Sequence, residues 1–280
     1  MKGGDDLFDS IGPGTVALMG VPWDEHSSFM RGPALAPPKI RGALHSGSCN
    51  LCAEKGEDLG TGERFRDVGD LSFEGQGAPV EVIEKAAGRL LTRGARILCL
   101  GGDHAVTYPL LRAYAAKFGP VDVLHLDAHP DLYDEFEGDP LSHACPFARV
   151  MEEGLAARLI QVGIRTMNPH QRSQADRFGV EVMEMKDWNP SLLPAFERPV
   201  YLSLDLDVLD PAFAPGVSHH EPGGLSTREV IRVIQGLKGS IIGADIVEYN
   251  PTRDPIGMTA MVAAKMVKEI AAKMLMQEES

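Results

Sequence analysis

A chain of 280 residues with 44% apolar side chains can bury one large core without disulfides, so we expect a single domain over residues 1–280. The formal net charge of -13 repels phosphate backbones, which disfavours a nucleic-acid partner and suits a small cationic one. Four cysteines are too few for a disulfide framework. Met1 to Asp6 shows no basic region before an apolar run, and no apolar stretch has the length of a membrane span. We therefore expect a cytoplasmic protein without a membrane partner.

Short β-branched and aliphatic runs alternate with segments of helical period, a pattern typical of parallel strands joined by crossover helices. Eight runs are expected strands: Thr15 to Met19, Phe65 to Val68, Arg96 to Leu100, Val121 to Leu126, Leu159 to Gly163, Val180 to Met185, Val200 to Leu204 and Ile241 to Ile246. The fold class predicted is α/β, a three-layer α/β/α sandwich with a central, mostly parallel sheet of eight strands.

Three segments between or after these runs are expected helices. Pro79 to Arg93 has one apolar face and is followed by Gly94, a residue that commonly stops helices. Ser226 with Glu229 three residues later is a capping box and predicts a helix start. From Thr259 onward, apolar residues recur at helical spacing, and the methionines among them are expected in the core rather than at a cofactor site.

Polar clusters follow several expected strands at the carboxyl ends, where open α/β sheets bind ligands. The metal-ligand candidates in these clusters are His104, Asp127, His129, Asp131, Asp205 and Asp207. Taken singly, each cluster also fits turn or helix-cap chemistry, and the Asp205 and Asp207 pair also fits a calcium or magnesium site. Together, six ionisable groups would each cost several kcal/mol if left unpaired, which indicates a metal centre.

Two imidazoles and four carboxylates suit two divalent ions bridged by carboxylates. Manganese is preferred over zinc or calcium on ligand softness, with nickel and cobalt left open. Two such ions lower the pKa of a bridging water and supply hydroxide at neutral pH. The pattern therefore predicts a hydrolase.

The same motifs, with Gly20-Val21-Pro22-Trp23-Asp24 near the start, resemble the ureohydrolases, the family of arginase, agmatinase and their relatives. The resemblance covers nearly the whole chain and is greatest to plant-type arginases, through segments that include Ser27-Ser28-Phe29. It implies two Mn(II) per chain and a homotrimer or homohexamer. One ion would be held by His104, Asp127, Asp131 and Asp205, and the other by Asp127, His129, Asp205 and Asp207.

The resemblance also implies three catalytic residues. Asp131 and His143 would pass a proton to the departing amine, and Glu248 would hold the guanidinium. These roles make physical sense because a carboxylate pairs well with a planar cation, and a departing nitrogen must be protonated. The alternatives are a local hydrogen bond at a helix start for His143 and a surface salt bridge for Glu248.

The expected substrate is a small cationic guanidino compound, foremost L-arginine, which would give L-ornithine and urea. Agmatine, which would give putrescine and urea, is the alternative. The loop from Leu132 to Ser142 departs from the animal-arginase pattern that holds the α-carboxylate, and it carries four acids: Asp134, Glu135, Glu137 and Asp139. An acidic loop favours the ammonium tail of agmatine, unless these carboxylates form only a solvated rim.

Two hypotheses of a different class remain. A deacetylase of similar architecture would use one zinc, and the additional ligand candidates argue against it. A silent regulatory paralogue would be expected to have lost a metal ligand or Glu248, and neither loss is visible.

Several further residues receive lesser roles. Ser203 and Asp210 are expected to orient the ligand loop by hydrogen bonds. His125 is expected to be a packed or supporting group rather than a ligand, and His219 and His220 to border the pocket mouth. The Cys49 and Cys52 pair has no second pair at zinc-finger spacing, so we interpret it as structural.

Overall fold

The computed structural model describes residue 8 and residues 11–276, so the chain start discussed above lies outside the described residues. Its centre is one sheet of eight parallel strands in the order β2-β1-β3-β8-β7-β4-β5-β6. The strands are β1 (Val16–Gly20), β2 (Phe65–Asp70), β3 (Arg96–Leu100), β4 (Val121–Leu126), β5 (Ala156–Ile164), β6 (Glu181–Glu184), β7 (Val200–Asp205) and β8 (Ile241–Val247). All eight expected strands are present. The largest difference is in β5, which begins at Ala156 rather than Leu159.

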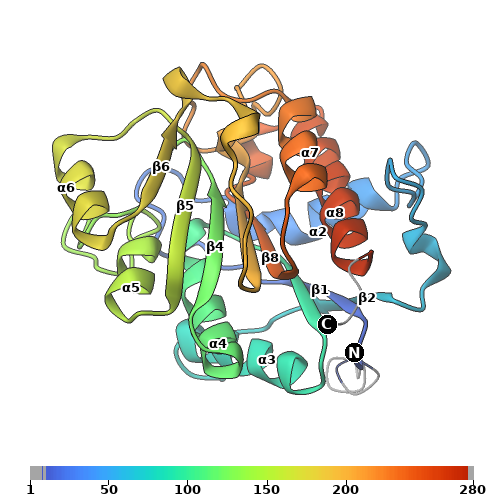
Figure 1. The fold of residues 1–280 in the computed structure, drawn as a ribbon. Coiled ribbons are helices and arrows are strands. Elements are labelled where there is room, and N and C mark those ends of the chain that lie inside the picture. The colour runs from blue at the N-terminus through green and yellow to red at the C-terminus, as the bar shows by residue number, and fades with distance from the viewer. Residues whose placement is uncertain (1–7, 9–10, 277–280) are drawn as a thin grey trace.

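Helices cover both faces of the sheet, which confirms the three-layer prediction (Figure 1). One layer consists of α2 (Ala36–Leu44), α7 (Thr227–Gly236) and α8 (Met258–Leu275), and the other of α3 (Pro79–Thr92), α4 (Thr107–Phe118), α5 (Pro146–Glu152) and α6 (Pro169–Phe178). Short 3-10 turns are η1 (Pro33–Leu35), η2 (Leu59–Thr61), η3 (His104–Val106), η4 (Met185–Asp187), η5 (Pro190–Leu192), η6 (Leu206–Val208) and η7 (Pro251–Arg253).

Each face of the sheet has its own apolar core because successive side chains of a strand point to opposite faces. In β3, Leu98 and Leu100 pack under α2 and α8, whereas Ile97 and Cys99 pack under α3 and α4. The methionines of α8, such as Met266, are fully buried in the first core, as expected.

The expected helix signals are also present. Ser226 accepts the Glu229 N–H at 3.2 Å, and the Glu229 carboxylate accepts the Ser226 N–H at 2.8 Å, so the capping box starts α7. Helix α3 ends at Thr92, two residues before Gly94. Gly94 has a φ of 83°, a conformation that glycine adopts at little cost. No helix among the described residues is long and apolar enough to cross a membrane.

The order of the strands explains why the polar clusters meet. The four central strands are β3, β8, β7 and β4, and they are followed respectively by His104, Glu248, Asp207 and Asp127. Because all four strands are parallel, their carboxyl ends lie at the same edge of the sheet. Segments that are far apart in the sequence therefore deliver their side chains to one place.

Candidate metal centre and active site

The turn after β3 fixes His104 at the base of the cluster. A Cβ on Gly102 would lie 1.8 Å from the carbonyl oxygen of Trp23, so only glycine fits there. The Trp23 carbonyl accepts the Asp103 N–H at 3.1 Å, and the Asp103 carboxylate in turn caps η3 by accepting the Ala105 N–H. His104 is fully buried as a result.

Hydrogen bonds assign the tautomer of His104. The Ser203 hydroxyl donates to Asp245 Oδ1 at 2.7 Å, so its oxygen accepts the Nε2–H of His104 at 2.9 Å. The other ring nitrogen, Nδ1, is buried and has no hydrogen-bond partner among the described residues. It lies 3.1, 3.0 and 3.3 Å from carboxylate oxygens of Asp127, Asp131 and Asp205. A lone pair directed at three carboxylates is the arrangement of a metal ligand.

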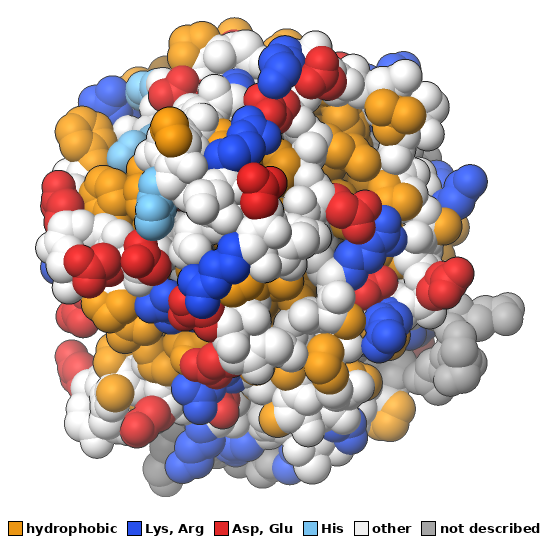
Figure 2. All heavy atoms as spheres, turned by 60° about the vertical axis from the view of Figure 1, so that its left-hand side comes forward, with side chains coloured by type: hydrophobic (Ala, Val, Ile, Leu, Met, Phe, Trp, Pro, Cys, Tyr) orange, Lys and Arg blue, Asp and Glu red, His pale blue; other side chains and the backbone are white. Residues whose placement is uncertain are grey.

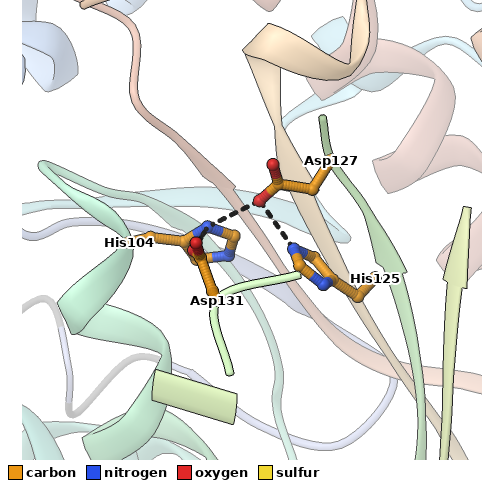
Figure 3. A group of neighbouring side chains, drawn as sticks. All are labelled: His104, His125, Asp127 and Asp131. Atoms are coloured by element: carbon orange, nitrogen blue, oxygen red, sulfur yellow. Dashed lines mark hydrogen bonds and ion pairs between the residues drawn. The ribbon is translucent and has the colours of Figure 1, made fainter. Parts of the chain in front are cut away.

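A second set of hydrogen bonds orients Asp127. Gln161 Nε2 donates to His125 Nδ1 at 3.1 Å, so His125 Nε2–H donates to Asp127 Oδ2 at 2.7 Å. Figure 3 shows the Asp127 carboxylate between His104 and His125, with the Asp131 carboxylate beside the His104 ring. Because both His125 nitrogens are used in this way, His125 orients a ligand and is not itself directed at a metal.

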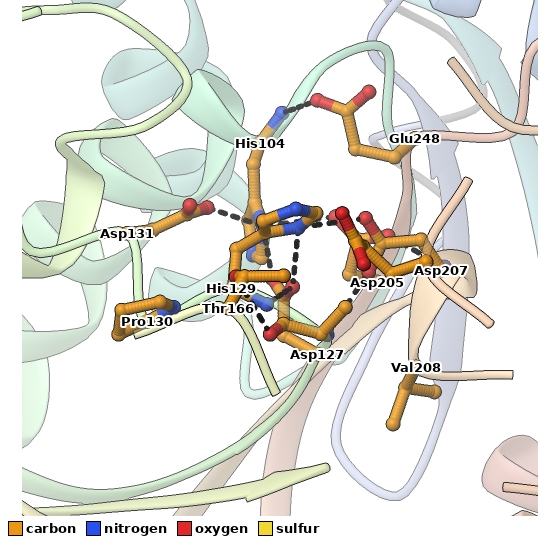
Figure 4. Close-up of polar contacts among 12 residues, drawn as sticks. His104, Asp127, His129, Pro130, Asp131, Thr166, Asp205, Asp207, Val208 and Glu248 are labelled. Carbon is orange, nitrogen blue, oxygen red and sulfur yellow. Dashed lines mark hydrogen bonds and ion pairs between the residues drawn. The ribbon is translucent and has the colours of Figure 1, made fainter. Parts of the chain in front are cut away.

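His129 and Asp207 form the second part of the cluster. His129 Nδ1 lies 2.9 Å from Asp207 Oδ2 and 3.4 Å from Asp127 Oδ1. Asp205, at the end of β7, accepts the Asp207 N–H at 2.7 Å. The structure thus brings together all six candidate ligands as two groups that share Asp127 (Figure 4).

The electrostatics of the cluster suit cations. Burial, together with Asp207 and Asp127, raises the pKa of Asp205 well above its usual value. Burial and Asp127 also raise the pKa of Asp207, against the influence of His129. Carboxylates that raise one another's pKa are mutually repulsive, and a divalent ion between them would relieve this repulsion. The donor set, with one freely directed imidazole nitrogen in each group, therefore fits the two metals expected.

Glu248 lies above the cluster in an unusual backbone conformation. Its φ is 63°, and Asp131 has a φ of 49°; of the described non-glycine residues, only one other has positive φ. Such strain commonly accompanies functional sites. Glu248 Oε1 accepts the backbone N–H of His104 at 2.9 Å and Nδ1–H of His143 at 2.7 Å. None of the described residues donates to Oε2, which is left for another donor.

His143 is held from three directions. Its backbone N–H donates to the His26 carbonyl at 3.1 Å, its Nδ1 contacts Glu248, and its Nε2 lies 2.8 Å from the Ser28 hydroxyl. Burial alone would lower the pKa of His143, but the negative charges of Glu248, Asp103 and Asp131 raise it to about 9. The His143 side chain is 9% exposed, and it lines the cavity described next.

A cavity of about 270 Å³ opens above the cluster. It is lined by Ser28, His129, Asp131, Tyr133, Phe136, His143, Ala144, Thr166, Gln171, Asp205, Asp207, His219, Glu221 and Glu248. The volume is near the lower limit of about 300 Å³ for ligand pockets, which suits a molecule of amino-acid size. No lysine or arginine of the described residues lines it, and the lining includes the Glu221 carboxylate as well as neutral hydroxyl and amide groups.

The four acids of the 132–142 loop do not line this cavity. Asp134 pairs with His170 at 3.0 Å, Asp139 pairs with His26 at 2.6 Å, and Glu135 and Glu137 are exposed. Acidic and basic side chains intermingle over the face in Figure 2, and histidines gather at one side of it. The structure therefore supports the solvated-rim alternative, and the electrostatic argument for agmatine from this loop fails.

The remaining expectations can be placed. His219 lines the cavity, with its ring centre 5.6 Å from that of His129 and 5.4 Å from that of His143, whereas His220 is exposed and contacts the Pro215 carbonyl. Asp210 stabilises its own loop by accepting backbone N–H groups of residues 212 and 223, and no contact joins it to the ligands.

Three positioning residues were not singled out from the sequence: Ser28, Gln161 and Asp245. Asp245 is fully buried within β8 and accepts hydroxyl hydrogens from Thr107, Tyr201 and Ser203. An aspartate inside an otherwise apolar strand was a usable signal, because a buried carboxylate requires donors. Gln161 carries the same signal inside β5, and Ser28 carries none beyond its place in a resembling motif.

Comparison with known proteins gives consistent matches. A sequence profile of the Arginase family matches residues 14–272. "Arginase 1, mitochondrial" of Arabidopsis thaliana is 48% identical, and the match covers 92% of this chain and 81% of that protein. The solved structure of arginase from Medicago truncatula superposes with a TM-score of 0.90 at 45% identity, covering 96% of this chain and 91% of that one. "Agmatinase, mitochondrial" of Gallus gallus is 35% identical over 91% of this chain and 79% of its own length.

These matches contradict the expected cytoplasmic location. Several plant relatives that match over most of the chain are named as mitochondrial or chloroplastic proteins. The expectation was wrong because a low cysteine count and the lack of a membrane-length apolar run do not distinguish the cytosol from the interior of an organelle.

Proposed function

The chain belongs to the arginase family and is a metal-dependent amidinohydrolase, and from this premise we propose that it hydrolyses L-arginine to L-ornithine and urea. The observation that supports this proposal most is the position of Glu248, with one free carboxylate oxygen on the cavity wall above the cluster. A guanidinium hydrogen-bonded there would have its carbon held toward the cluster.

We propose two manganese ions per chain, in line with the donor types. One would be held by His104, Asp127, Asp131 and Asp205, and the other by Asp127, His129, Asp205 and Asp207. Bound divalent ions of this kind lower the pKa of a water so that hydroxide is present near neutral pH.

Proton delivery to the departing amine is assigned to Asp131 and His143. Both line the cavity, and the pKa of His143, about 9, keeps its imidazole protonated at neutral pH. Its Nε2 hydrogen bonds to Ser28, which also lines the cavity, so a proton on Nε2 has a short path to the substrate. His143 thus acts as a reserve of one proton beside the leaving nitrogen.

Arginine is placed before agmatine because of the high identity to plant arginases. Agmatine remains the second candidate, since no cation lines the cavity to pair with the α-carboxylate of arginine, while Glu221 suits the ammonium of either molecule. A silent regulatory role is the third candidate, and it has no support from the intact cluster.

One comparison tests the proposal. Urea release by the manganese-loaded protein would be measured with arginine, agmatine, 4-guanidinobutyrate and free guanidine at equal concentration, and bound metal would be counted on the same sample. We expect about two manganese per chain and an arginine preference. A preference for agmatine would make agmatine the substrate in place of arginine, and one bound zinc would indicate a different hydrolase. If neither urea release nor bound metal is detected, the silent role is indicated.

Two expectations stay open beside this proposal. We propose a homotrimer or homohexamer, which light scattering on the purified protein would test. We also propose one domain over residues 1–280, and a single thermal transition of the metal-loaded protein would be the expected result.

A further inference from the structure

A Cys-x-x-Cys segment lies in the connection between α2 and β2. Asn50 Oδ1 accepts the Cys52 N–H at 3.1 Å, which turns the chain between the two cysteines, and a bridge from Cys52 to Asp58 closes a short hairpin. Both cysteines are free thiols; Cys52 is exposed and Cys49 is partly buried. The two cysteines thus lie three positions apart on either side of a turn, and a disulfide between them requires Cα atoms within about 7 Å.

A buried lysine contacts the less exposed cysteine. Lys268 of α8 is only 8% exposed, and its Nζ lies 3.3 Å from Cys49 Sγ and 2.9 Å from the Asn50 carbonyl oxygen. Among the described residues, no carboxylate pairs with this ammonium. Lysines are rarely buried without a counter-charge. The polar groups that this ammonium contacts are the sulfur of Cys49 and the Asn50 carbonyl.

The neighbouring carboxylate, that of Glu269, is already paired with other donors, so Cys49 is the side chain that contacts Lys268. Glu269 is 2% exposed and accepts from Lys265 at 2.5 Å, from Gln235 at 2.8 Å and from the Glu54 N–H at 3.0 Å. These bonds fasten the hairpin to α8 immediately beside Lys268. The position of the ammonium against Cys49 is therefore fixed by its surroundings.

We propose that Cys49 and Cys52 form a reversible redox pair that exchanges with low-molecular-weight disulfides of the glutathione class, with Cys49 as the attacking sulfur and Lys268 as its positive neighbour. A thiolate, not a thiol, is the nucleophile in such exchange, and a nearby lysine favours it. This site is independent of the proposed hydrolysis. The hairpin leads into the amino end of β2, whereas the metal cluster lies at the carboxyl ends of the strands.

The exchange takes two steps. The Cys49 thiolate bonds to one sulfur of the small disulfide and releases the other half as a thiolate. Cys52 then gives up its proton, bonds to Cys49 Sγ and releases the second half, and the proton passes to one of the released thiolates. The two cysteines lose two electrons and the small disulfide gains them, so a dithiol reverses the reaction.

The other two cysteines are internal controls. Burial raises the pKa of Cys99 well above its usual value, and burial with Asp131 raises the pKa of Cys145 to about 12. Both should stay reduced and unreactive in the folded protein.

The test uses folded, manganese-loaded protein. After incubation with oxidised glutathione, peptide mass spectrometry should find a Cys49 to Cys52 link that dithiothreitol removes, with two of the four thiols lost. With limiting iodoacetamide, Cys49 should react faster than the more exposed Cys52. Lys268→Met should slow Cys49 alkylation at least about tenfold, and Lys268→Arg should preserve it.

Unchanged urea release by both variants would show that they fold. If instead Cys52 reacts first in the wild-type chain, if Lys268→Met leaves the Cys49 rate unchanged, or if glutathione stays attached without a link between the two cysteines, the redox pair is ruled out. Because the readout is thiol chemistry, these outcomes do not depend on which substrate the enzyme hydrolyses.

Discussion

The imidazole of His143 donates from Nδ1 to Oε1 of Glu248 over 2.7 Å, although the two residues are 105 positions apart. The contact joins the loop before α5 to the strained residue after β8. It places a protonated ring beside the carboxylate proposed to hold the guanidinium. Because both groups are nearly fully buried, the charge on one strongly affects the titration of the other.

We expect Glu248→Gln to flatten the pH dependence of stability. In the wild-type protein His143 has a pKa raised from 6.5 to about 9. Below pH 6.5 the ring is protonated in both states and its pairing stabilises the fold fully. Above pH 6.5 only the folded state keeps the proton, so stability falls with rising pH until about pH 9. The total loss is at most roughly 3 kcal/mol.

The variant keeps both hydrogen bonds but removes the charge, so this fall should shrink. Scanning calorimetry of the manganese-loaded proteins at several pH values would measure this fall in stability. Heat is preferred to chemical denaturants because urea is a product of the reaction and guanidinium resembles the substrate. Glu135→Gln, at an exposed position outside the cavity, is the control. An equal fall in wild type and Glu248→Gln would mean that Glu248 does not raise the pKa of His143.

Ser28→Ala should lower kcat with little change in KM. The hydroxyl lies 2.8 Å from His143 Nε2, and its removal takes away one of the two side-chain contacts that fix the ring, leaving only the contact with Glu248. A misplaced acid-base group costs roughly tenfold or more in rate. Ser28→Thr keeps the hydroxyl and should restore most of the rate in the same urea assay. An unchanged kcat in the alanine variant would show that Ser28 takes no part in proton delivery.

The fold was predictable because its signals are local. Each strand is a short apolar run bounded by turn residues, and the Ser226 and Glu229 pair marks a helix start by itself. The strand ends were less certain, as the earlier start of β5 shows. The resemblance to plant-type arginases, based on motifs spread over the chain, is confirmed by the matches.

The site was predictable only as far as spacing determines it. The six candidate ligands meet because parallel strands end at one edge, and their pattern shows where those strands end. The support around them comes from distant strands. Gln161 contacts His125 through the β4 and β5 register, which no sequence spacing reveals. Likewise, the acids of the 132–142 loop point away from the cavity because of partners such as His170 and His26.

Gln161→Leu should weaken manganese binding by about ten- to a hundredfold. The side chain is fully buried and donates to His125 Nδ1 and to the Pro130 carbonyl at 2.6 Å, so it fixes both the His125 tautomer and the ligand loop. Leucine has a similar size and donates nothing. Gln174→Leu is a matched control, because Gln174 is also buried and its Nε2 has no partner in the described part of the chain. Metal titration would show equal losses in both variants if the effect were only on packing.

Asp205→Asn should change stability in opposite directions with and without metal. Burial, Asp207 and Asp127 raise the pKa of Asp205, so without metal its negative charge is unfavourable and becomes more so as pH rises. The variant should therefore be more stable than wild type in EDTA at neutral pH. Manganese should stabilise the variant less than it stabilises the wild-type protein, because a proposed bridging ligand is lost. Full manganese-dependent stabilisation in Asp205→Asn would contradict the bridging role.

Glu221→Gln should alter substrate preference rather than the chemistry. Arg165 donates to the Glu221 backbone carbonyl at 3.0 Å from its Nε, which fixes the position of Glu221 at the cavity wall. With no cation lining the cavity, the Glu221 carboxylate attracts a distal ammonium and repels a distal carboxylate. Agmatine carries only that ammonium, 4-guanidinobutyrate carries only the carboxylate, and arginine carries both.

The variant should raise KM for agmatine by roughly tenfold, the effect of about 1.4 kcal/mol, lower it for 4-guanidinobutyrate, and change it less for arginine, whose two charged groups are affected in opposite directions. The kcat values should change little because the cluster and Glu248 are intact. Glu137→Gln, on the exposed loop, should leave all three KM values unchanged. The opposite shifts for ammonium and carboxylate substrates are the decisive feature, since a general disturbance of the cavity would raise every KM together. A uniform rise in KM for all three substrates would therefore show that Glu221 does not select the substrate. The neutral groups of the cavity wall would then be the ones that contact the tail of the substrate.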